Sequence, residues 1–352
     1  MEVDSQKPSR RSDGTLHERR DQLPWQKDRR FRILSIDGGG IRGIFPAAIL
    51  AEFERKFLGG DSVGDYFDLI AGTSTGGIIA LGLAIGLPAS KILDLYFSNG
   101  AEIFPAAAPP FKSIKRFWAK FRSLNYYQYS REPLERELRQ IFGTLTIGDA
   151  QRRLCIPSFD GFTEVNVFKT PHHPDFRLDW REEMVTVALA TSAAPTYFSV
   201  YKDGQRRFAD GGVWANNPVM VALVDALTCN MIERDQIDIL SIGCGDAEIK
   251  MSDAQILRGG LWHWREIVSS AMHLASQNAL GQAGLLIGRD RLIRLNTPPF
   301  AGGAIGLDDV KRANTELPKI AKILAEQNGP LVAARFFSSK AEPFSHFHGS
   351  KV

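Results

Sequence analysis

A strand, a glycine turn and a helix follow one another twice near the start of the chain. Phe31–Ile36 is a short apolar run that ends in Asp37 and three glycines, and Pro46–Phe57 then carries apolar residues at helical spacing. Tyr66–Ala71 is a second apolar run, which passes through another glycine turn into the apolar stretch Gly77–Ile85. Such alternation predicts an α/β fold in which helices cover a mainly parallel central sheet.

Further elements of both kinds follow along the chain. Apolar runs predict strands at Leu154–Phe159, Thr163–Phe168 and Ile237–Ile242. Apolar residues at helical spacing predict helices at Pro133–Phe142, Met184–Thr191, Pro218–Asn230, Trp264–Leu280 and Val310–Gln327. The Pro/Ala-rich piece Phe104–Pro110 is expected to be a loop.

Charge and polarity argue against a nucleic-acid-binding, a membrane-spanning and a secreted protein. Residues 1–30 hold eight Lys/Arg, six Asp/Glu and few apolar side chains, so they are expected to form a flexible arm. The net charge of +3 is too small to indicate a nucleic-acid polymer as partner. No run approaches the roughly 18 apolar residues of a membrane-spanning helix, and residues 1–30 lack the apolar segment of a signal peptide. We therefore expect a cytoplasmic protein that meets membranes only at their surface.

The turn at residues 72–76 places a serine between two glycines. Gly72-Thr73-Ser74-Thr75-Gly76 lies between a predicted strand and a predicted helix, which is the setting of a nucleophile elbow. Side chains at Gly72 and Gly76 would collide where the backbone lifts the serine hydroxyl above the sheet. The amides that open the next helix favour negative charge at this point. For this motif alone, a serine that merely caps the helix is the alternative.

The glycine loop after the first strand admits two interpretations. Gly38–Gly43 matches the G-x-G-x-x-G pattern of dinucleotide-binding folds, which also need an acidic residue about 20 residues further on. The candidates at that distance are Asp61, Asp65 and Asp68. All three precede the second strand, whose end carries Ser74 instead. We therefore favour a loop that offers backbone N–H groups to an oxyanion, with Arg42 adding positive potential.

A nucleophilic serine needs a base, and histidine is the usual choice. The histidines are His17, His172, His173, His263, His273, His346 and His348. None has the strand-to-loop setting typical of a catalytic triad, and His172 and His173, between two prolines, are expected in a surface loop. A carboxylate is the better candidate. Asp210 precedes Gly211 and Gly212, an arrangement that on its own would indicate only a turn.

Taken in order, three motifs resemble the signatures of the patatin-like phospholipase family: Asp37–Gly43, the turn at 72–76 and Asp210–Gly212. Ala193–Phe198 and Asn216–Pro218 are similar to the same pattern, and the resemblance spans Phe31 to Gly245. It implies a three-layer α/β/α fold, a Ser–Asp dyad and no requirement for a metal or other cofactor. It also implies hydrolysis of acyl esters, typically those of membrane phospholipids.

The resemblance assigns a role to each motif. Ser74 becomes the nucleophile and Asp210 the base, with Gly211 and Gly212 completing the aspartate motif. The oxyanion loop consists of Gly38, Gly39, Gly40, Arg42 and Gly43, and the amides of Gly39 and Gly40 are the foremost donors. Water assisted by Asp210 would release the fatty acid. Because a carboxylate is a weak base for a hydroxyl, burial would have to raise its pKa.

The resemblance also suggests an organisation and a biological setting. We expect residues 1–30 to be the flexible arm, 31–245 the catalytic core, and 246–352 a C-terminal helical part of the same domain. Within the family, the chain resembles bacterial patatin phospholipases that act in antiphage defence. Those enzymes are switched on by a cyclic dinucleotide and degrade the host's inner membrane. The resemblance therefore implies a cyclic dinucleotide activator and a peripheral location at the inner membrane when the enzyme is active.

Residues 111–122 are a candidate membrane contact. They hold five basic residues, no acidic one, and aromatic or aliphatic residues at helical spacing. A basic amphipathic segment of this kind suits an anionic lipid surface, with Phe117 and Trp118 as anchors. The alternative is an ordinary surface helix whose apolar stripe docks on the core.

Other functions stay open at this stage. One is an unregulated carboxylesterase, which would be active on a short-chain ester without any activator. Another is a non-catalytic lipid or nucleotide sensor that retains the fold, and a third is a dinucleotide-dependent oxidoreductase. A homo-oligomer also stays open.

Overall fold

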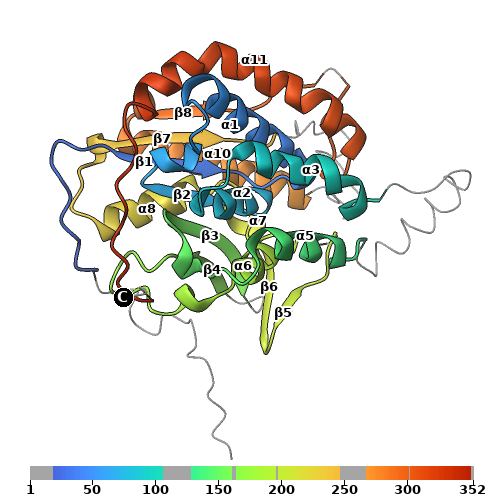
Figure 1. The fold of residues 1–352 in the computed structure, drawn as a ribbon, viewed down its shortest axis with the longest axis horizontal. Coiled ribbons are helices and arrows are strands. Elements are labelled where there is room, and N and C mark those ends of the chain that lie inside the picture. The colour runs from blue at the N-terminus through green and yellow to red at the C-terminus, as the bar shows by residue number, and fades with distance from the viewer. Residues whose placement is uncertain are drawn as a thin grey trace, which may run out of the picture.

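The computed structural model describes residues 19–105, 128–160, 164–195, 197–245, 267–300 and 302–349. Its centre is an eight-stranded sheet with the order β5-β6-β3-β2-β1-β7-β8, and β4 pairs with β3 outside this path (Figure 1). The strands are β1 (Phe31–Ile36), β2 (Leu69–Gly72), β3 (Arg153–Asp160), β4 (Glu164–Lys169), β5 (Tyr201–Asp203), β6 (Arg206–Asp210), β7 (Ile237–Ile242) and β8 (Leu292–Leu295). The pairings β3-β2-β1-β7-β8 are parallel, whereas β4, β5 and β6 join the sheet antiparallel.

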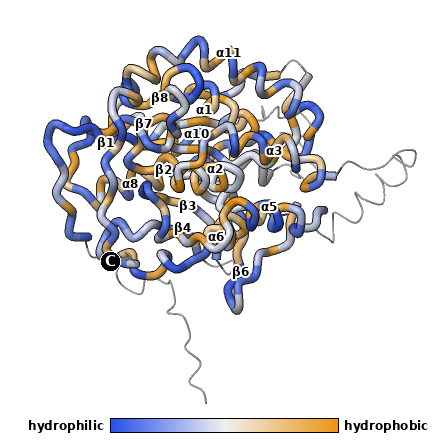
Figure 2. The backbone as a smooth tube through the Cα atoms, viewed as in Figure 1, coloured by the Kyte–Doolittle hydropathy of each residue, from blue (hydrophilic) through white to orange (hydrophobic). Residues whose placement is uncertain are grey.

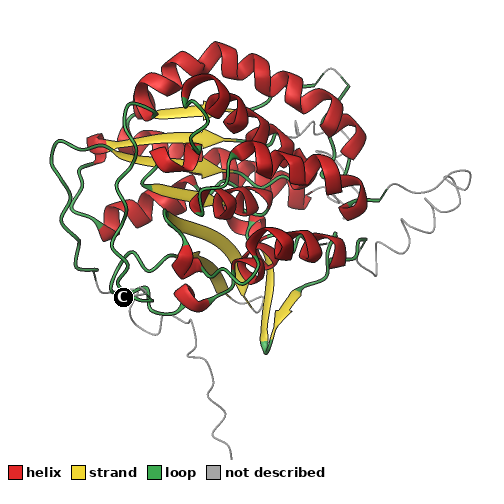
Figure 3. Cartoon of the chain, in the orientation of Figure 1, coloured by secondary structure: helices red, strands yellow, loops and turns green. Residues whose placement is uncertain are grey.

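Helices cover both faces of this sheet. The α-helices are α1 (Ile44–Phe57), α2 (Thr75–Ala84), α3 (Ala89–Ile103), α5 (Glu132–Phe142), α6 (Met184–Thr191), α7 (Gly212–Ala215), α8 (Val219–Cys229), α10 (Ile267–Ile287) and α11 (Val310–Phe336). Side chains of β1 point alternately to the two faces of the sheet, so the hydrophobic core has two parts. Leu34 and Ile36 pack on one face with α1, α2, α6 and α11. Phe31 and Ile33 pack on the other face with α8 and α10. The strands run between these two helical layers (Figure 3). Figure 2 shows the hydrophobic residues concentrated inside the molecule and hydrophilic ones along its outer loops.

The predicted α/β fold with a mainly parallel sheet is confirmed. The strands Phe31–Ile36 and Ile237–Ile242 and the helix Met184–Thr191 have the predicted bounds. The sequence analysis did not anticipate α3, the β5–β6 hairpin or β8. None of the described helices combines the length and the apolar character needed to cross a bilayer.

Two strands run toward each other along one edge of β3. β2 pairs in parallel with the start of β3, at Arg153 to Cys155, and β6 pairs antiparallel with its end, at Ser158 to Asp160. β4 occupies the opposite edge of β3, so β2 and β6 share the remaining one. Because they run in opposite directions, their carboxyl ends face each other across the middle of β3. The chain leaves β2 into residues 73–76, and β6 ends at Asp210.

Residues 19–30, the end of the expected arm, lie against the core. The amide of Leu23 donates to Cys229 and the Leu23 carbonyl accepts from Met231, both at 2.8 Å. The Trp25 ring lies 4.9 Å from that of Phe31, between ring centroids. Residues 1–18 lie outside the described residues. So do residues 111–122, with the candidate membrane anchors Phe117 and Trp118.

Candidate active site

Ser74 sits at a sharp turn between β2 and α2. Its φ of 55° and ψ of −123° make it the only non-glycine residue with positive φ in the described part of the chain. Such a conformation is costly for a residue with a Cβ, and it persists where the surrounding structure enforces it. The turn holds the serine hydroxyl at the amino end of α2, where helix amides favour developing negative charge.

Close backbone contacts explain the glycines around Ser74. A Cβ on Gly72 would lie 2.0 Å from the Gly76 carbonyl oxygen, and one on Gly76 would lie 2.3 Å from that of Ile36. A Cβ on Gly43 would lie 2.2 Å from Thr75 Oγ1. These positions are therefore restricted to glycine by packing of the turn against β1 and the glycine loop.

Asp210 faces Ser74 from the end of β6. Ser74 Oγ donates a hydrogen bond to Asp210 Oδ2 at 2.6 Å, and the amide of Gly212 donates to Asp210 Oδ1 at 2.7 Å. Both side chains are buried. Burial raises the pKa of Asp210 to about 6, although the hydrogen bonds from Ser74 and Gly212 act to lower it. A carboxylate with this pKa is ionised at neutral pH and is a stronger base than an exposed aspartate.

The middle of β3 and the end of α6 hold the two residues in place. Thr191 Oγ1 accepts from the Ser74 amide at 3.0 Å and donates to the Pro157 carbonyl at 2.6 Å. The Asp210 amide donates to the Ala193 carbonyl at 3.0 Å. Pro157 lies on β3 between the residues that pair with β2 and those that pair with β6. Its missing N–H therefore breaks no backbone hydrogen bond on that edge of β3. The sequence analysis missed these supports.

The glycine loop lies beside Ser74. A Cβ on Gly38 would lie 3.2 Å from Ser74 Cβ, and Gly40 has a positive φ of 56°. The Gly38 amide already donates to the Asn216 carbonyl at 3.0 Å. Among the described residues, no acceptor bonds the amides of Gly39 and Gly40. These two amides are therefore the ones available to an oxyanion.

An ion pair anchors the start of this loop. Arg294, on β8, donates to both carboxylate oxygens of Asp37 at 2.9 and 2.7 Å, and Asp37 is only 2% exposed. Arg42 donates to the carbonyls of Gly39 at 3.3 Å and Gly245 at 2.7 Å, so its guanidinium braces the loop. Nothing in the sequence around Arg294 pointed to this role.

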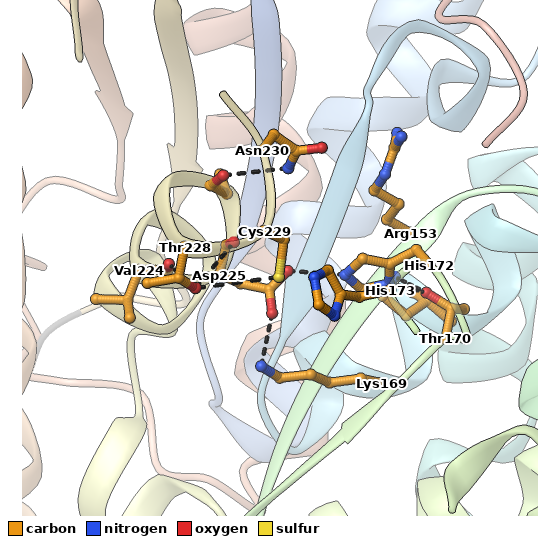
Figure 4. Close-up of polar contacts among 12 residues, drawn as sticks. Arg153, Lys169, Thr170, His172, His173, Val224, Asp225, Thr228, Cys229 and Asn230 are labelled. Atoms are coloured by element: carbon orange, nitrogen blue, oxygen red, sulfur yellow. Dashed lines mark hydrogen bonds and ion pairs between the residues drawn. The ribbon is translucent and has the colours of Figure 1, made fainter. Parts of the chain in front are cut away.

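The expectation that His172 and His173 lie in a surface loop is wrong, because both are buried. His172 Nδ1 bonds Thr170 Oγ1 at 2.7 Å and its Nε2 bonds Asp225 Oδ2 at 2.8 Å, while Lys169 Nζ donates to Asp225 Oδ1 at 2.6 Å (Figure 4). Ligand atoms of His172, Asp225 and Cys229 lie within 4.8 Å of one another, a spacing that could suit a metal. The Lys169 ammonium already neutralises this carboxylate, however, so the cluster is complete without a metal.

Comparisons with known proteins show the family to which the chain is similar. The profile of the patatin-like phospholipase family matches residues 34–223, which contain both Ser74 and Asp210. A cGAMP-activated phospholipase of Vibrio cholerae is 35% identical over 88% of this chain and 92% of its own length. A cGAMP-activated phospholipase of Escherichia coli is 34% identical over 90% of this chain and 95% of its own length. Patatin-like protein 2 of Oryza sativa subsp. indica is 29% identical over 86% and 85%.

The family match covers more than half of the 352 residues and includes the glycine loop, the serine turn and the aspartate motif. The bacterial relatives extend the similarity over nearly the whole chain. The chain therefore belongs to the patatin-like phospholipase family and is an acyl ester hydrolase.

Proposed function

We propose that this enzyme cleaves acyl esters of membrane phospholipids with a Ser74–Asp210 dyad and that a cyclic dinucleotide activates it. The observation that carries the catalytic part is the 2.6 Å hydrogen bond from Ser74 Oγ to the buried carboxylate of Asp210, which pairs with no cation in the described part of the chain. The activation part is supported by the two bacterial relatives, whose names describe them as activated by cGAMP.

The first half of the reaction transfers the acyl group to the enzyme. Asp210 Oδ2 accepts the proton of Ser74 as Oγ attacks the ester carbonyl carbon. The amides of Gly39 and Gly40 donate to the resulting oxyanion. Collapse of the tetrahedral intermediate breaks the ester bond, and the proton on Asp210 passes to the departing lysophospholipid alkoxide.

The second half restores the enzyme. Asp210, again ionised, accepts a proton from a water molecule that attacks the acyl-Ser74 carbonyl. The second oxyanion is held by the same amides, and its collapse releases the fatty acid and returns the proton to Ser74 Oγ. Removing one oxyanion donor of this type typically costs about 10²–10³ in rate, so the glycine loop contributes substantially beside the dyad.

The proposed setting is antiphage defence at the cytoplasmic surface of the inner membrane. An enzyme that degrades the membrane of its own cell has to be silent until a signal arrives, and a cyclic dinucleotide would be that signal. Residues 111–122, with Phe117 and Trp118, are the proposed membrane contact because of their basic and aromatic character.

The test is fatty-acid release from vesicles of phosphatidylethanolamine and phosphatidylglycerol. We assay three proteins with and without 3′,3′-cGAMP: wild type, Ser74→Ala and the control Ser339→Ala. Ser339 is an exposed serine after α11. We expect release only by wild type and the control, and only with the nucleotide. Equal release without nucleotide would favour the unregulated carboxylesterase. Release by Ser74→Ala would refute the dyad, and silence of every sample would favour the non-catalytic sensor.

A further inference from the structure

Asn216 lies beside the dyad, but the reaction proposed above gives its side chain no role. It follows α7 directly. A Cβ on Gly38 would lie 2.7 Å from Asn216 Oδ1 and 3.2 Å from Ser74 Cβ. A Cβ on Gly212 would lie 3.2 Å from Asn216 Oδ1 and 3.0 Å from Asp210 Oδ1. The Asn216 carboxamide is therefore a neighbour of both Ser74 and Asp210.

Hydrogen bonds hold the backbone on either side of this carboxamide. The Thr73 hydroxyl, in the serine turn, donates to the Ala215 carbonyl at 2.6 Å. The Gly38 amide donates to the Asn216 carbonyl at 3.0 Å. Asn217 Oδ1 accepts an amide at the start of α8, also at 3.0 Å. The position of Asn216 is thus fixed by the serine turn, the glycine loop and α8, without a contribution from its own side chain.

The Asn216 carboxamide itself makes no hydrogen bond within the described residues. Its Oδ1 is buried without a partner, and its Nδ2 donates to none of these residues. Because the residue as a whole is only half-buried, Nδ2 is the end of the side chain that a substrate can reach. A buried polar atom without a hydrogen bond lowers the stability of the fold, and such atoms are uncommon in native proteins. An unused donor beside the nucleophile indicates a partner that arrives with the substrate.

An uncharged donor suits this place electrostatically. Nδ2 of an asparagine carries two N–H groups and no net charge. A cation here would stabilise the ionised form of Asp210 and make it a weaker base, whereas an amide leaves that carboxylate without a counter-charge. The donor can therefore act on the substrate without weakening the proposed base.

We propose that Asn216 Nδ2 donates to the oxyanion, as a third donor beside the amides of Gly39 and Gly40. The inference rests on the proposed attack by Ser74. As Oγ bonds the ester carbon and its proton passes to Asp210, the ester oxygen takes up the negative charge. A hydrogen bond to this oxygen strengthens as the charge develops, so it lowers the barrier more than it tightens substrate binding.

The experiment follows hydrolysis of p-nitrophenyl butyrate by the full-length protein, with and without 3′,3′-cGAMP. Asn216→Leu keeps the approximate size of the side chain and removes the donor, and Asn278→Leu changes an exposed asparagine on α10 as the matched control. We expect kcat of Asn216→Leu to fall by about 10²–10³-fold with KM within about threefold of wild type. Its resistance to urea should equal or exceed that of wild type, because no hydrogen bond is lost.

A trifluoromethyl ketone reports on the oxyanion independently of turnover. Ser74 Oγ adds to its carbonyl carbon, the proton passes to Asp210, and the ketone oxygen becomes an oxyanion that stays bound. The inhibition constant should rise in Asn216→Leu by about the factor by which kcat/KM falls. Asn216→Ala, which adds no bulk, should change both quantities in the same direction.

Several outcomes would overturn this role for Asn216. They are a wild-type kcat and inhibition constant in both variants, a change confined to KM, and a loss of activity matched by a loss of stability. Activity lost in Asn216→Leu but kept in Asn216→Ala would trace the loss to bulk and overturn it too. Hydrolysis by Ser74→Ala at the wild-type rate would refute the proposed nucleophile, and with it this inference, whereas an inactive Ser74→Ala beside active Asn216 variants would refute the inference alone.

Discussion

Two buried aspartates in this enzyme have opposite electrostatic surroundings. Asp210 and Asp225 are 4% and 2% exposed. Within the described residues, Asp210 accepts hydrogen bonds from the Ser74 hydroxyl and the Gly212 amide and meets no cation, and burial raises its pKa to about 6. Burial acts on Asp225 in the same direction, but Lys169 and His172 more than offset it and hold the pKa of Asp225 well below its usual range. Burial alone does not create a base; burial without a neighbouring cation does.

The comparison suggests a division of labour. Asp225 joins β4, the Thr170–His172 segment and α8 through a neutralised network, so its effect should be on stability. The ionised carboxylate of Asp210 is buried, and this burial lowers the stability of the folded protein. Substitution of Asp210 should therefore change the rate of the reaction rather than reduce stability. Substitutions at the two positions can separate these effects.

The largest expected effect is that of Asp210→Asn on catalysis. The amide keeps the size of the side chain but cannot accept the Ser74 proton as a base, so turnover should fall by roughly 10⁴-fold or more. Removing a buried carboxylate should leave the free energy of unfolding at pH 8 unchanged or raise it by up to about 3 kcal/mol. Vesicle assays and urea denaturation measure the two quantities. Loss of stability together with activity would contradict the proposed role.

The opposite profile is expected for Asp225→Asn. The substitution leaves the Lys169 ammonium buried without its counter-charge, which should cost about 3–5 kcal/mol of stability. Turnover per folded molecule, measured at low temperature, should stay within about threefold of wild type because no catalytic contact is lost. The double variant Lys169→Met/Asp225→Asn should recover part of the loss. A variant as stable as wild type would mean that the network contributes little.

A smaller effect is expected at Arg294, which holds the glycine loop through Asp37. Arg294→Gln breaks the bidentate pair and should let the Gly39 and Gly40 amides move, so that kcat falls by about 10²-fold. KM for a soluble ester should change by less than about threefold, because an oxyanion loop, the role proposed here for residues 38–43, stabilises charge that develops only in the transition state. Arg294→Lys should restore part of kcat. A change confined to KM would instead indicate a role in substrate binding.

These predictions draw on residues that sequence reasoning could reach only in part. The elbow, the glycine loop and Asp210 were found because each motif is short and contiguous, and because strands such as Phe31–Ile36 are continuous apolar runs. The β5–β6 hairpin was missed although Gly204, in a left-handed conformation at its turn, was a usable signal. Helix α3 was also missed, although Ile92, Leu95 and Tyr96 have helical spacing.

The remaining parts of the site have no local signal. Arg294 lies 257 positions from Asp37, and His172 lies 53 positions from Asp225. Whether a buried carboxylate meets a cation or a hydroxyl depends on such long-range packing. The sequence therefore indicated that Asp210 needed a raised pKa, but only the folded surroundings account for it.

The smallest expected effect is that of pH, which also tests the comparison of Asp210 with Asp225. The rate should fall by about tenfold for each pH unit below the pKa of Asp210. Because Asp210 must be ionised to act as the proposed base, kcat/KM for a soluble ester should rise with pH and level off above about pH 6, the pKa of this carboxyl. Its contribution to stability has the opposite sign. The folded pKa exceeds the unfolded one, so between about pH 4 and 6 the folded state holds more protons and stability falls as pH rises.

Asp225 behaves in reverse, since its lowered pKa stabilises the fold above about pH 4 and this stabilisation is lost on acidification. Rate profiles from pH 4.5 to 8.5 test the sign for Asp210 in the reaction. Unfolding measured from about pH 2.5 to 8.5 in wild type, Asp210→Asn and Asp225→Asn tests the signs of both contributions to stability. An inflection of the rate near pH 4 would mean that Asp210 is not held in a cation-free site during catalysis. The expected result is an inflection of the rate near pH 6, together with a stability difference between wild type and Asp210→Asn that grows over the same range. It would mean that the burial that makes this carboxylate a stronger base also lowers the folding stability.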